Sequence, residues 1–332
     1  MNNFFVALLG ALLATNAPFA VSNLVAQQTG VSINVPDPND PVEKEYHKLT
    51  AEDDDAHAEV DQWIRESQES ARKGIKGPAE LVGFRVKARV APVRAGYEDF
   101  LARHPNHARA RIAFGSFLND HGEEEAAIDQ WEKAREAEPG IPSTWNNLAN
   151  FYGHHGPVKK AFEYYAKAME LDSKQAVYFW NLATTVYMFR KDAMEYYHLD
   201  ETQVFDKALD LYRQAMKRDP ANFVLSSDYA ESFYLTKPPR WKEGLAAWED
   251  SLKLAPTELE REAVRLHLAR IKTRLGNFDE AQQELNVVTN EECLALKRKL
   301  QSNIDAARTG STNPPVHPNS PPLATPVPSG SK

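Results

Sequence analysis

Cysteine is almost absent from this sequence, and so are the short motifs that mark most enzyme sites. Cys293 is the only cysteine among the 332 residues. An internal disulfide, a zinc site built on cysteines and an iron–sulfur cluster are therefore excluded. The sequence contains no nucleophile elbow, HExxH pair, P-loop or glycine-rich dinucleotide loop. We therefore expect a protein that is not an enzyme and that uses no metal or cofactor.

An excess of positive charge is also missing. Lys and Arg number 39 against 47 Asp and Glu, which gives a net charge of −8. Because nucleic-acid binding needs a basic face, nucleic acid is not expected as a partner. The acids gather in residues 36–55, which hold eight acids and two lysines. Three prolines in residues 36–41 disfavour a helix there, so residues 27–49 are predicted to be a flexible acidic linker.

Long apolar runs are limited to the N-terminal end. Residues Phe4–Ala14 read FFVALLGALLA, which is too short to span a hydrocarbon core of about 30 Å as a helix. The run has the length of a signal-peptide core, and small residues suited to cleavage follow at Ala17, Ala20 and Ala26. The sequence predicts a signal peptide over 1–26 and export to the bacterial periplasm or outside the cell. An uncleaved anchor remains the alternative.

An internal repeat is what the sequence does contain. Residues 108–141 and 142–175 align over 34 positions without a gap, as in HGEEEAAIDQWEKAREAEP and HGPVKKAFEYYAKAMELDS. Three further copies follow over 176–222, 223–258 and 262–290, the first of them with about 13 extra residues near 189–202. Self-similarity at this period is typical of a solenoid of stacked repeats.

The repeat resembles the tetratricopeptide family. The copy over 142–175 has the family's large and small residues at their expected positions: Trp145, Leu148, Ala149, Tyr152, Ala161, Tyr165 and Ala168. The resemblance implies an all-α, right-handed superhelical solenoid of about five helix–turn–helix repeats. In such a repeat the small residues let the two helices approach closely, and the large residues fill the space toward the next pair.

The segments on either side of the array are predicted by pattern. Residues 50–107 are expected to hold an N-terminal helix and an irregular, degenerate leading repeat. Residues 291–308 have acids first and bases later, as a helix dipole favours, and should form a capping helix over the last repeat. Residues 309–332 contain seven prolines, so we expect a disordered tail with polyproline II character.

Local signals predict where individual helices start and turn. Three pairs have capping-box spacing: Asp200 with Gln203, Thr257 with Glu260, and Thr289 with Glu292. Three glycines fall in the turns between paired helices, where a left-handed residue is often needed: Gly122, Gly156 and Gly276.

The resemblance also implies a partner-binding groove. In the family the first helix of each repeat lines a concave surface, and carrying those positions over gives seven candidate residues: Asn146, Asn150, Trp180, Thr184, Tyr187, Glu231 and Tyr234. Amides can bond a peptide backbone, and aromatic rings supply contact area. One family subtype clamps a C-terminal carboxylate with basic side chains. This chain has Ile112, Ser116 and Asn146 at those places, so that function is not expected.

The function predicted is a non-catalytic scaffold or adaptor that binds an unidentified protein or peptide. Two questions stay open, namely whether the insertion or the N-terminal helix covers Trp180, and whether another surface matters more. Residues Phe84–Arg94, read as a strand, would align Arg85, Lys87 and Arg89 on one face. An envelope-assembly component that binds an anionic glycan or lipid through this strip is therefore the alternative. An enzyme built on Asp192, Glu195 and His198 is a weaker one.

Overall fold

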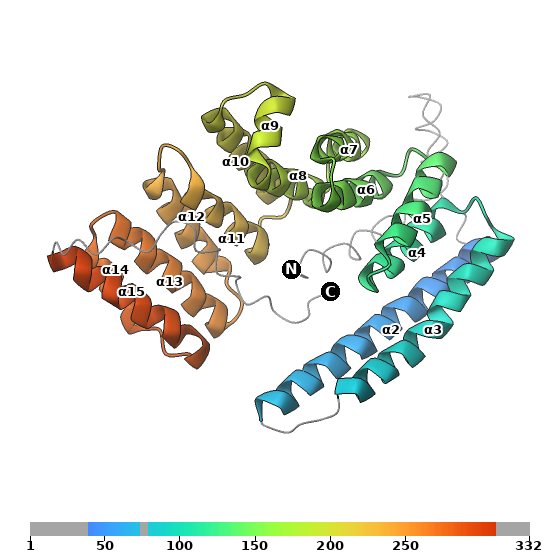
Figure 1. The fold of residues 1–332 in the computed structure, drawn as a ribbon, viewed down its shortest axis with the longest axis horizontal. Helices are drawn as coiled ribbons and strands as arrows, with labels where there is room; N and C mark the ends of the chain where they lie inside the picture. The colour runs from blue at the N-terminus through green and yellow to red at the C-terminus, as the bar shows by residue number, and fades with distance from the viewer. Residues whose placement is uncertain (1–38, 74–78, 310–332) are drawn as a thin grey trace. The chain divides into compact units, whose positions relative to one another are not determined.

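The computed structural model describes residues 39–73 and 79–309. The predicted signal peptide, the linker up to residue 38 and nearly all of the proline-rich tail lie outside these residues. Within the described ranges all regular structure is helical, and inside each unit helices such as α4 and α5, or α13 and α14, pack as neighbours (Figure 1). The predicted all-α fold class is confirmed. None of the described helices is both long and apolar enough to cross a bilayer.

The helices form two compact units that divide between Leu148 and Ala149, inside α6. The first unit holds α2 (Pro41–Arg72), α3 (Ala79–Arg103), α4 (Ala108–Asp120), α5 (Glu124–Ala137) and the start of α6 (Pro142–His155). The second holds the rest of α6, then α7 (Val158–Leu171), α8 (Ala176–Met188), α9 (Arg190–Tyr197), α10 (Glu201–Arg218), α11 (Phe223–Ser232), the 3₁₀ turn η2 (Phe233–Leu235), α12 (Trp241–Leu254), α13 (Glu258–Arg274), α14 (Phe278–Asn286) and α15 (Glu291–Thr309).

The first helix begins earlier than the sequence predicts. Helix α2 starts at Pro41, and the Asp40 side chain accepts a hydrogen bond from the Val42 backbone N–H at 2.8 Å. A proline in the first turn costs nothing, because the N–H it lacks would have no helical partner. The prediction of a flexible linker is therefore wrong for residues 41–49.

Residues 84–94 form a helix and not a strand. They lie inside α3, and the prediction of an irregular segment over 74–107 is wrong as well for the described part. Three side chains on one face of α3 are essentially fully buried: Val93, Tyr97 and Phe100. Their spacing of four and three residues is the helical period. This longer pattern outweighs the short alternation of basic residues.

A polar cluster holds α2, α3 and α4 together. The Tyr97 hydroxyl donates to Asp53 Oδ2 at 2.7 Å, and His57 Nδ1 lies 3.0 Å from Asp53 Oδ1. His57 Nε2 lies 3.5 Å from Asp120 Oδ2 on α4. The carboxylates of Asp120 and Asp53 raise the pKa of His57 to about 10. The imidazole is therefore a cation at neutral pH, between two acids from different helices.

Small residues set the distance between paired helices, as the repeat pattern implies. A Cβ added to Gly115 on α4 would lie 2.4 Å from Trp131 Nε1 on α5. That indole N–H donates to the Ile112 carbonyl at 3.2 Å. Ala127 and Ala134 on α5 are 0% exposed. The tryptophan thus fits only because glycine faces it.

The insertion near residues 189–202 folds as the short helix α9. It ends at His198, which adopts a left-handed conformation with φ of 53°. Its two tyrosines pack against the second helices of neighbouring repeats: Tyr196 and Tyr197 both contact Phe162 of α7, and Tyr197 lies 4.1 Å from Lys207 Nζ of α10. The insertion thus packs against α7 and α10.

Two of the three predicted capping boxes form. Those of α10 and α13 are complete, but the box predicted at Thr289 and Glu292 is wrong. Thr289 instead donates its N–H and its hydroxyl to Glu262 of α13, each at 3.0 Å. Asn290 Oδ1 accepts from the Glu292 N–H and caps α15. The three turn glycines all have positive φ: Gly122, Gly156 and Gly276.

Helix α15 covers the last helix pair. It packs against α13 and α14, and Leu300 and Ile304 join Ala281 and Leu285 in one buried cluster. This is the role expected of a capping helix in a solenoid.

Candidate functional site

The predicted residues of α8 lie on one face of that helix, in contact with neighbouring helices of the second unit. Trp180 is half-buried, and its indole Nε1–H donates to Asp228 Oδ2 on α11 at 2.8 Å. Thr184 Oγ1 lies 2.9 Å from the Tyr212 hydroxyl of α10. Tyr187 is half-buried, with its ring centroid 6.2 Å from that of Phe205. These contacts account for the orientation of Trp180.

Two carboxylates lie together on α11. Asp228 and Glu231 are one helical turn apart, so their side chains share a face. Burial raises the pKa of Asp228 to about 6. Burial and the Asp228 charge raise the pKa of Glu231 to about 7. Glu231 Oε1 is buried and has no hydrogen-bond partner. Negative charge is thus held here with little local compensation.

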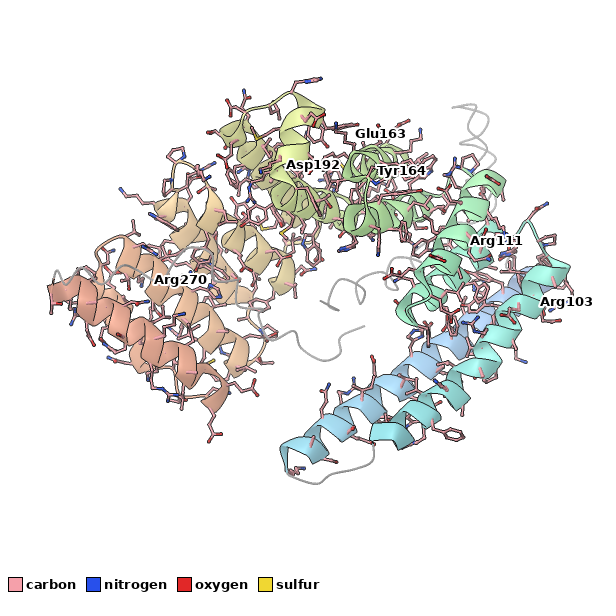
Figure 2. The ribbon with its side chains drawn as sticks, viewed as in Figure 1. Arg103, Arg111, Glu163, Tyr164, Asp192 and Arg270 are labelled. Atoms are coloured by element: carbon pink, nitrogen blue, oxygen red, sulfur yellow. The ribbon has the colours of Figure 1, made fainter. Side chains whose placement is uncertain are left out.

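Tyr234 connects η2 to α13. Its hydroxyl lies 2.9 Å from His267 Nδ1, and the Arg270 guanidinium lies 4.7 Å from its ring centroid. His267 stacks on Trp248 at 4.0 Å. Burial lowers the pKa of His267 to about 3, so this imidazole is neutral. Arg270, labelled on α13 in Figure 2, is therefore the positive charge of the cluster, and it acts against the raised pKa of Glu231.

The two predicted asparagines of α6 differ from the other candidates. Asn146 is 1% exposed and so offers a partner almost no surface. Asn150 is half-buried, and its Oδ1 accepts a hydrogen bond from the Tyr165 hydroxyl at 2.6 Å. Within the second unit, the predicted residues that lie on α8, α11 and η2 are the connected set: Trp180, Thr184, Tyr187, Glu231 and Tyr234. We call these five, together with Asp228 and Arg270, the acidic–aromatic cluster.

The basic strip of α3 does not present a row of free cations. Arg89 Nη1 lies 2.8 Å from Glu52 Oε1, and its Nε lies 3.0 Å from Glu59 Oε1. The Arg85 guanidinium lies 4.1 Å from the Trp63 ring centroid. Two of the three cations are therefore held by α2.

The groups of the enzyme alternative lie on α9 or at its end. Glu195 on α9 forms an ion pair with Lys159 of α7, and His198 ends the helix. In the described part of the chain, no group of three or more His, Cys, Asp or Glu side chains could hold a metal ion. Cys293 is buried, and burial raises the pKa of its thiol.

Sequence reasoning misses three members of this region, namely Asp228, His267 and Arg270. The spacing of Asp228 to Glu231 could have indicated the first, because residues three apart on a helix share a face. Nothing in the sequence indicates that His267 and Arg270 of α13 meet Tyr234, which is more than thirty residues away along the chain.

Comparison with known proteins agrees with this architecture. A family model described as a tetratricopeptide repeat matches residues 142–175. A TPR repeat-containing protein of Methanocaldococcus jannaschii is 28% identical over 139 residues, which cover 41% of this chain and 21% of that protein. The chain thus spans about a fifth of the length of this relative.

Solved structures with a similar fold share little sequence. The C-terminal part of a TPR repeat-containing protein from Cytophaga hutchinsonii has 12% identity and a TM-score of 0.49, covering 77% of this chain and 98% of that one. YrrB, described as a TPR protein with an unusual peptide-binding site, has 14% identity and a TM-score of 0.45, covering 64% and 96%. PilF of Pseudomonas aeruginosa has 21% identity and a TM-score of 0.45, covering 63% and 90%.

The fold is thus an all-α array of helix pairs, which is the architecture of an interaction scaffold. The family match over 142–175 and the helix pairs that surround it support a tetratricopeptide-repeat protein.

Proposed function

We propose that this chain is a non-catalytic scaffold whose acidic–aromatic cluster binds an extended segment of a partner protein that carries a basic side chain. The observation that carries the proposal is the state of Glu231, which has a buried, unpartnered carboxylate oxygen beside a second carboxylate. Burying negative charge without a partner costs stability. A cation supplied by a partner would offset that cost.

The aromatic side chains explain why the ligand would be a basic side chain and not a free metal ion. Trp180, Tyr187 and Tyr234 contribute half-buried rings to the cluster. Aromatic faces attract a Lys or Arg group, and they also cover its aliphatic stem. Asp228 would take part with its orientation already fixed, because Trp180 Nε1 holds its carboxylate at 2.8 Å. Family resemblance supplies the expectation that the ligand is a peptide.

The experiment is a binding measurement of the full chain against immobilised peptides of equal length that differ in one central Lys, Gln or Glu. We expect the Lys peptides to be retained, and binding to weaken as salt rises. Glu231→Gln keeps the shape of the side chain and removes its charge, so it should reduce retention of Lys peptides about tenfold or more.

A matched control removes the same charge elsewhere. Glu163 lies exposed on α7, a second helix (Figure 2), and Glu163→Gln should leave peptide binding unchanged. Equal retention of Lys and Glu peptides, or equal losses in the two variants, would contradict the proposal. Selective retention of Glu peptides by the basic strip of α3 would instead favour the anionic-ligand alternative.

We also propose that the chain is exported, with residues 1–26 as its signal peptide and the bacterial envelope as its location. The support is the apolar run Phe4–Ala14 with the small residues that follow it. Expression in a bacterium followed by fractionation and N-terminal sequencing tests this. A full-length chain that stays in the cytoplasm with its N-terminus uncut would overturn it.

A further inference from the structure

The acidic–aromatic cluster holds two carboxylates close together on one helix. Asp228 and Glu231 are one turn apart on α11, so their side chains share a face. The Trp180 indole N–H donates to Asp228 Oδ2 at 2.8 Å and fixes the orientation of that carboxylate. Glu231 Oε1 is buried and accepts no hydrogen bond from the described residues. Because neighbouring negative charges repel and a buried charge needs donors, the pair favours binding a proton.

The rings packed around the pair stay uncharged between pH 5 and 8. Burial lowers the pKa of His267 on α13 to about 3, so its imidazole is neutral in this range. Helix α12 contributes the uncharged ring of Trp248, which lies 6.4 Å from that of Tyr234. Burial also raises the pKa of three tyrosines, which therefore stay neutral and which come from α8, α10 and η2: Tyr187, Tyr212 and Tyr234.

Two arginines supply the positive charge near the pair, and both stay protonated in this range. Arg270 of α13 lies 4.7 Å from the Tyr234 ring and acts to lower the pKa of Glu231, but burial and the neighbouring carboxylate outweigh it. Arg190, at the start of α9, lies 5.5 Å from the ring of Tyr187. The two carboxyls of α11 are thus the groups of the cluster that change charge between pH 5 and 8.

We propose that this site exchanges a proton for its ligand: the free site keeps a proton on the pair Asp228 and Glu231, and the basic side chain of the partner displaces it on binding. The inference rests on the proposed function, because its ligand is the Lys or Arg group of a partner segment. The proton leaves a carboxyl oxygen for a base in the solvent, while the partner's cation keeps its own protons.

The direction of the pH dependence follows from linkage. A cation beside the pair stabilises the ionised carboxyls and so lowers their pKa in the complex. The free pair binds its proton below a pKa of about 7. Affinity for a basic ligand should therefore be highest above pH 7 and should fall as the pH drops below it, so the protein releases its ligand in acid.

The first measurement follows affinity against pH. The full chain is titrated at constant ionic strength with the central-Lys peptide and, as a reference, the central-Gln peptide, both free of His, Asp and Glu so that no ligand group titrates. One displaced proton and a free pKa of about 7 predict at least about tenfold weaker Lys-peptide binding at pH 5.5 than at pH 8. Binding of the Gln peptide should not change. Circular dichroism checks the fold at each pH.

Calorimetry counts the proton directly. The heat of binding, measured in two buffers of different ionisation enthalpy, gives the number of protons released per peptide. Because about half of the free sites hold the proton at a pH equal to the pKa, we expect about half a proton at pH 7 and about one at pH 6. Glu163→Gln, on α7, should leave both numbers unchanged.

Two variants should move the pH dependence in opposite directions, which a general loss of structure would not do. Glu231→Gln removes the group with the higher pKa, so the fall in affinity should shift to about pH 6 or below, where Asp228 titrates. Arg270→Gln removes a cation that lowers the pKa of Glu231, so the fall should begin at higher pH.

The outcomes separate this inference from the proposed function. Lys peptides that bind equally at pH 8 and pH 5.5, or with a heat that does not depend on the buffer, would overturn the proton exchange and leave the peptide site standing. An unchanged pH dependence in Glu231→Gln would overturn the assignment to the pair. Lys peptides that are not retained at any pH would overturn the proposed function, and this inference with it.

Discussion

The α2–α3 hairpin and the α13–α14 pair are both helical hairpins, but neighbours surround only the second. Helix α13 buries eight of its 17 residues, because α12, α14 and α15 all pack against it. Over residues 58–73 and 82–92 of the hairpin, no described side chain is buried. The comparison teaches that pairing alone does not make a core. A repeat becomes stable when helices lie on both of its sides, as in other solenoids.

The largest expected effect is the difference in stability loss between two Trp→Ala substitutions, one in the repeat array and one in the α2–α3 hairpin. Trp248 of α12 is 0% exposed, and Trp248→Ala should cost about 3–5 kcal/mol of unfolding free energy, because it leaves a cavity. Trp63→Ala in the outer half of α2 should cost less than about 1 kcal/mol, because the side chain is already half-exposed. Urea unfolding of both variants measures the difference. Equal losses would show that the α2–α3 hairpin is packed as tightly around Trp63 as the repeats are around Trp248.

The second effect concerns the polar cluster between the α2–α3 hairpin and α4, and it depends on pH. Because folding raises the pKa of His57 to about 10, its stabilisation is complete below the free-histidine pKa of about 6.5 and is lost as the pH rises toward 10. His57→Gln should lower the stability of the first unit by about 2 kcal/mol at pH 6. The difference from wild type should vanish near pH 10. Hydrogen exchange of α2 and α3 at several pH values provides the measurement, and a constant difference would refute the assignment.

A third, smaller effect has the opposite sign, because a substitution on α11 should stabilise the protein. A carboxyl whose folded pKa is raised favours folding below its unfolded pKa of about 4.3 and opposes folding above its folded pKa, here about 7. Glu231→Gln should therefore stabilise the second unit by about 1 kcal/mol at pH 8. At pH 4 the variant and wild type should unfold alike. Thermal unfolding at the two pH values decides this, and a loss of stability at pH 8 would mean that Glu231 is well paired.

The smallest effect is expected at Phe84. Removing this ring in Phe84→Ser should change the unfolding free energy by less than about 0.5 kcal/mol, because the side chain is 71% exposed. Urea unfolding of the variant and of the wild type measures the change. A large loss of stability would place Phe84 in the hydrophobic core.

Much of the fold follows from sequence because its signals are local. The 34-residue period, the small residues opposite large ones, and the caps at Asp200 and Thr257 each involve residues in one repeat or one turn. The mistakes also have local causes. Pro41 is compatible with a first helical turn as well as with a linker, and the alternation over 84–94 is too short to separate a strand from a helix. At Thr289, the more distant Glu262 takes the hydrogen bonds that a capping box would use.

Only part of the candidate site can be predicted from the sequence. Its position on the first helices comes from the repeat pattern, and Trp180, Thr184 and Tyr187 lie on α8 with the spacing of one helix face. Asn146 occupies the position in its repeat that Trp180 occupies in the next one, but packing buries it. The partner of each polar group is set by contacts across 28 to 48 residues, as with Trp180 and Asp228 or Thr184 and Tyr212. No single-sequence pattern records such pairs.

The sequence by itself determined that this chain is helical and repetitive, because periodicity and composition are properties of short stretches. Tertiary structure alone decided which charges are compensated. Packing against other helices places His57 beside two acids and leaves a carboxylate oxygen of Glu231 unpartnered. It also leaves residues 58–73 and 82–92 of the α2–α3 hairpin without a buried side chain among those described. The physical reason is that burial and charge pairing depend on what lies across a contact, which the order of residues along one helix does not specify.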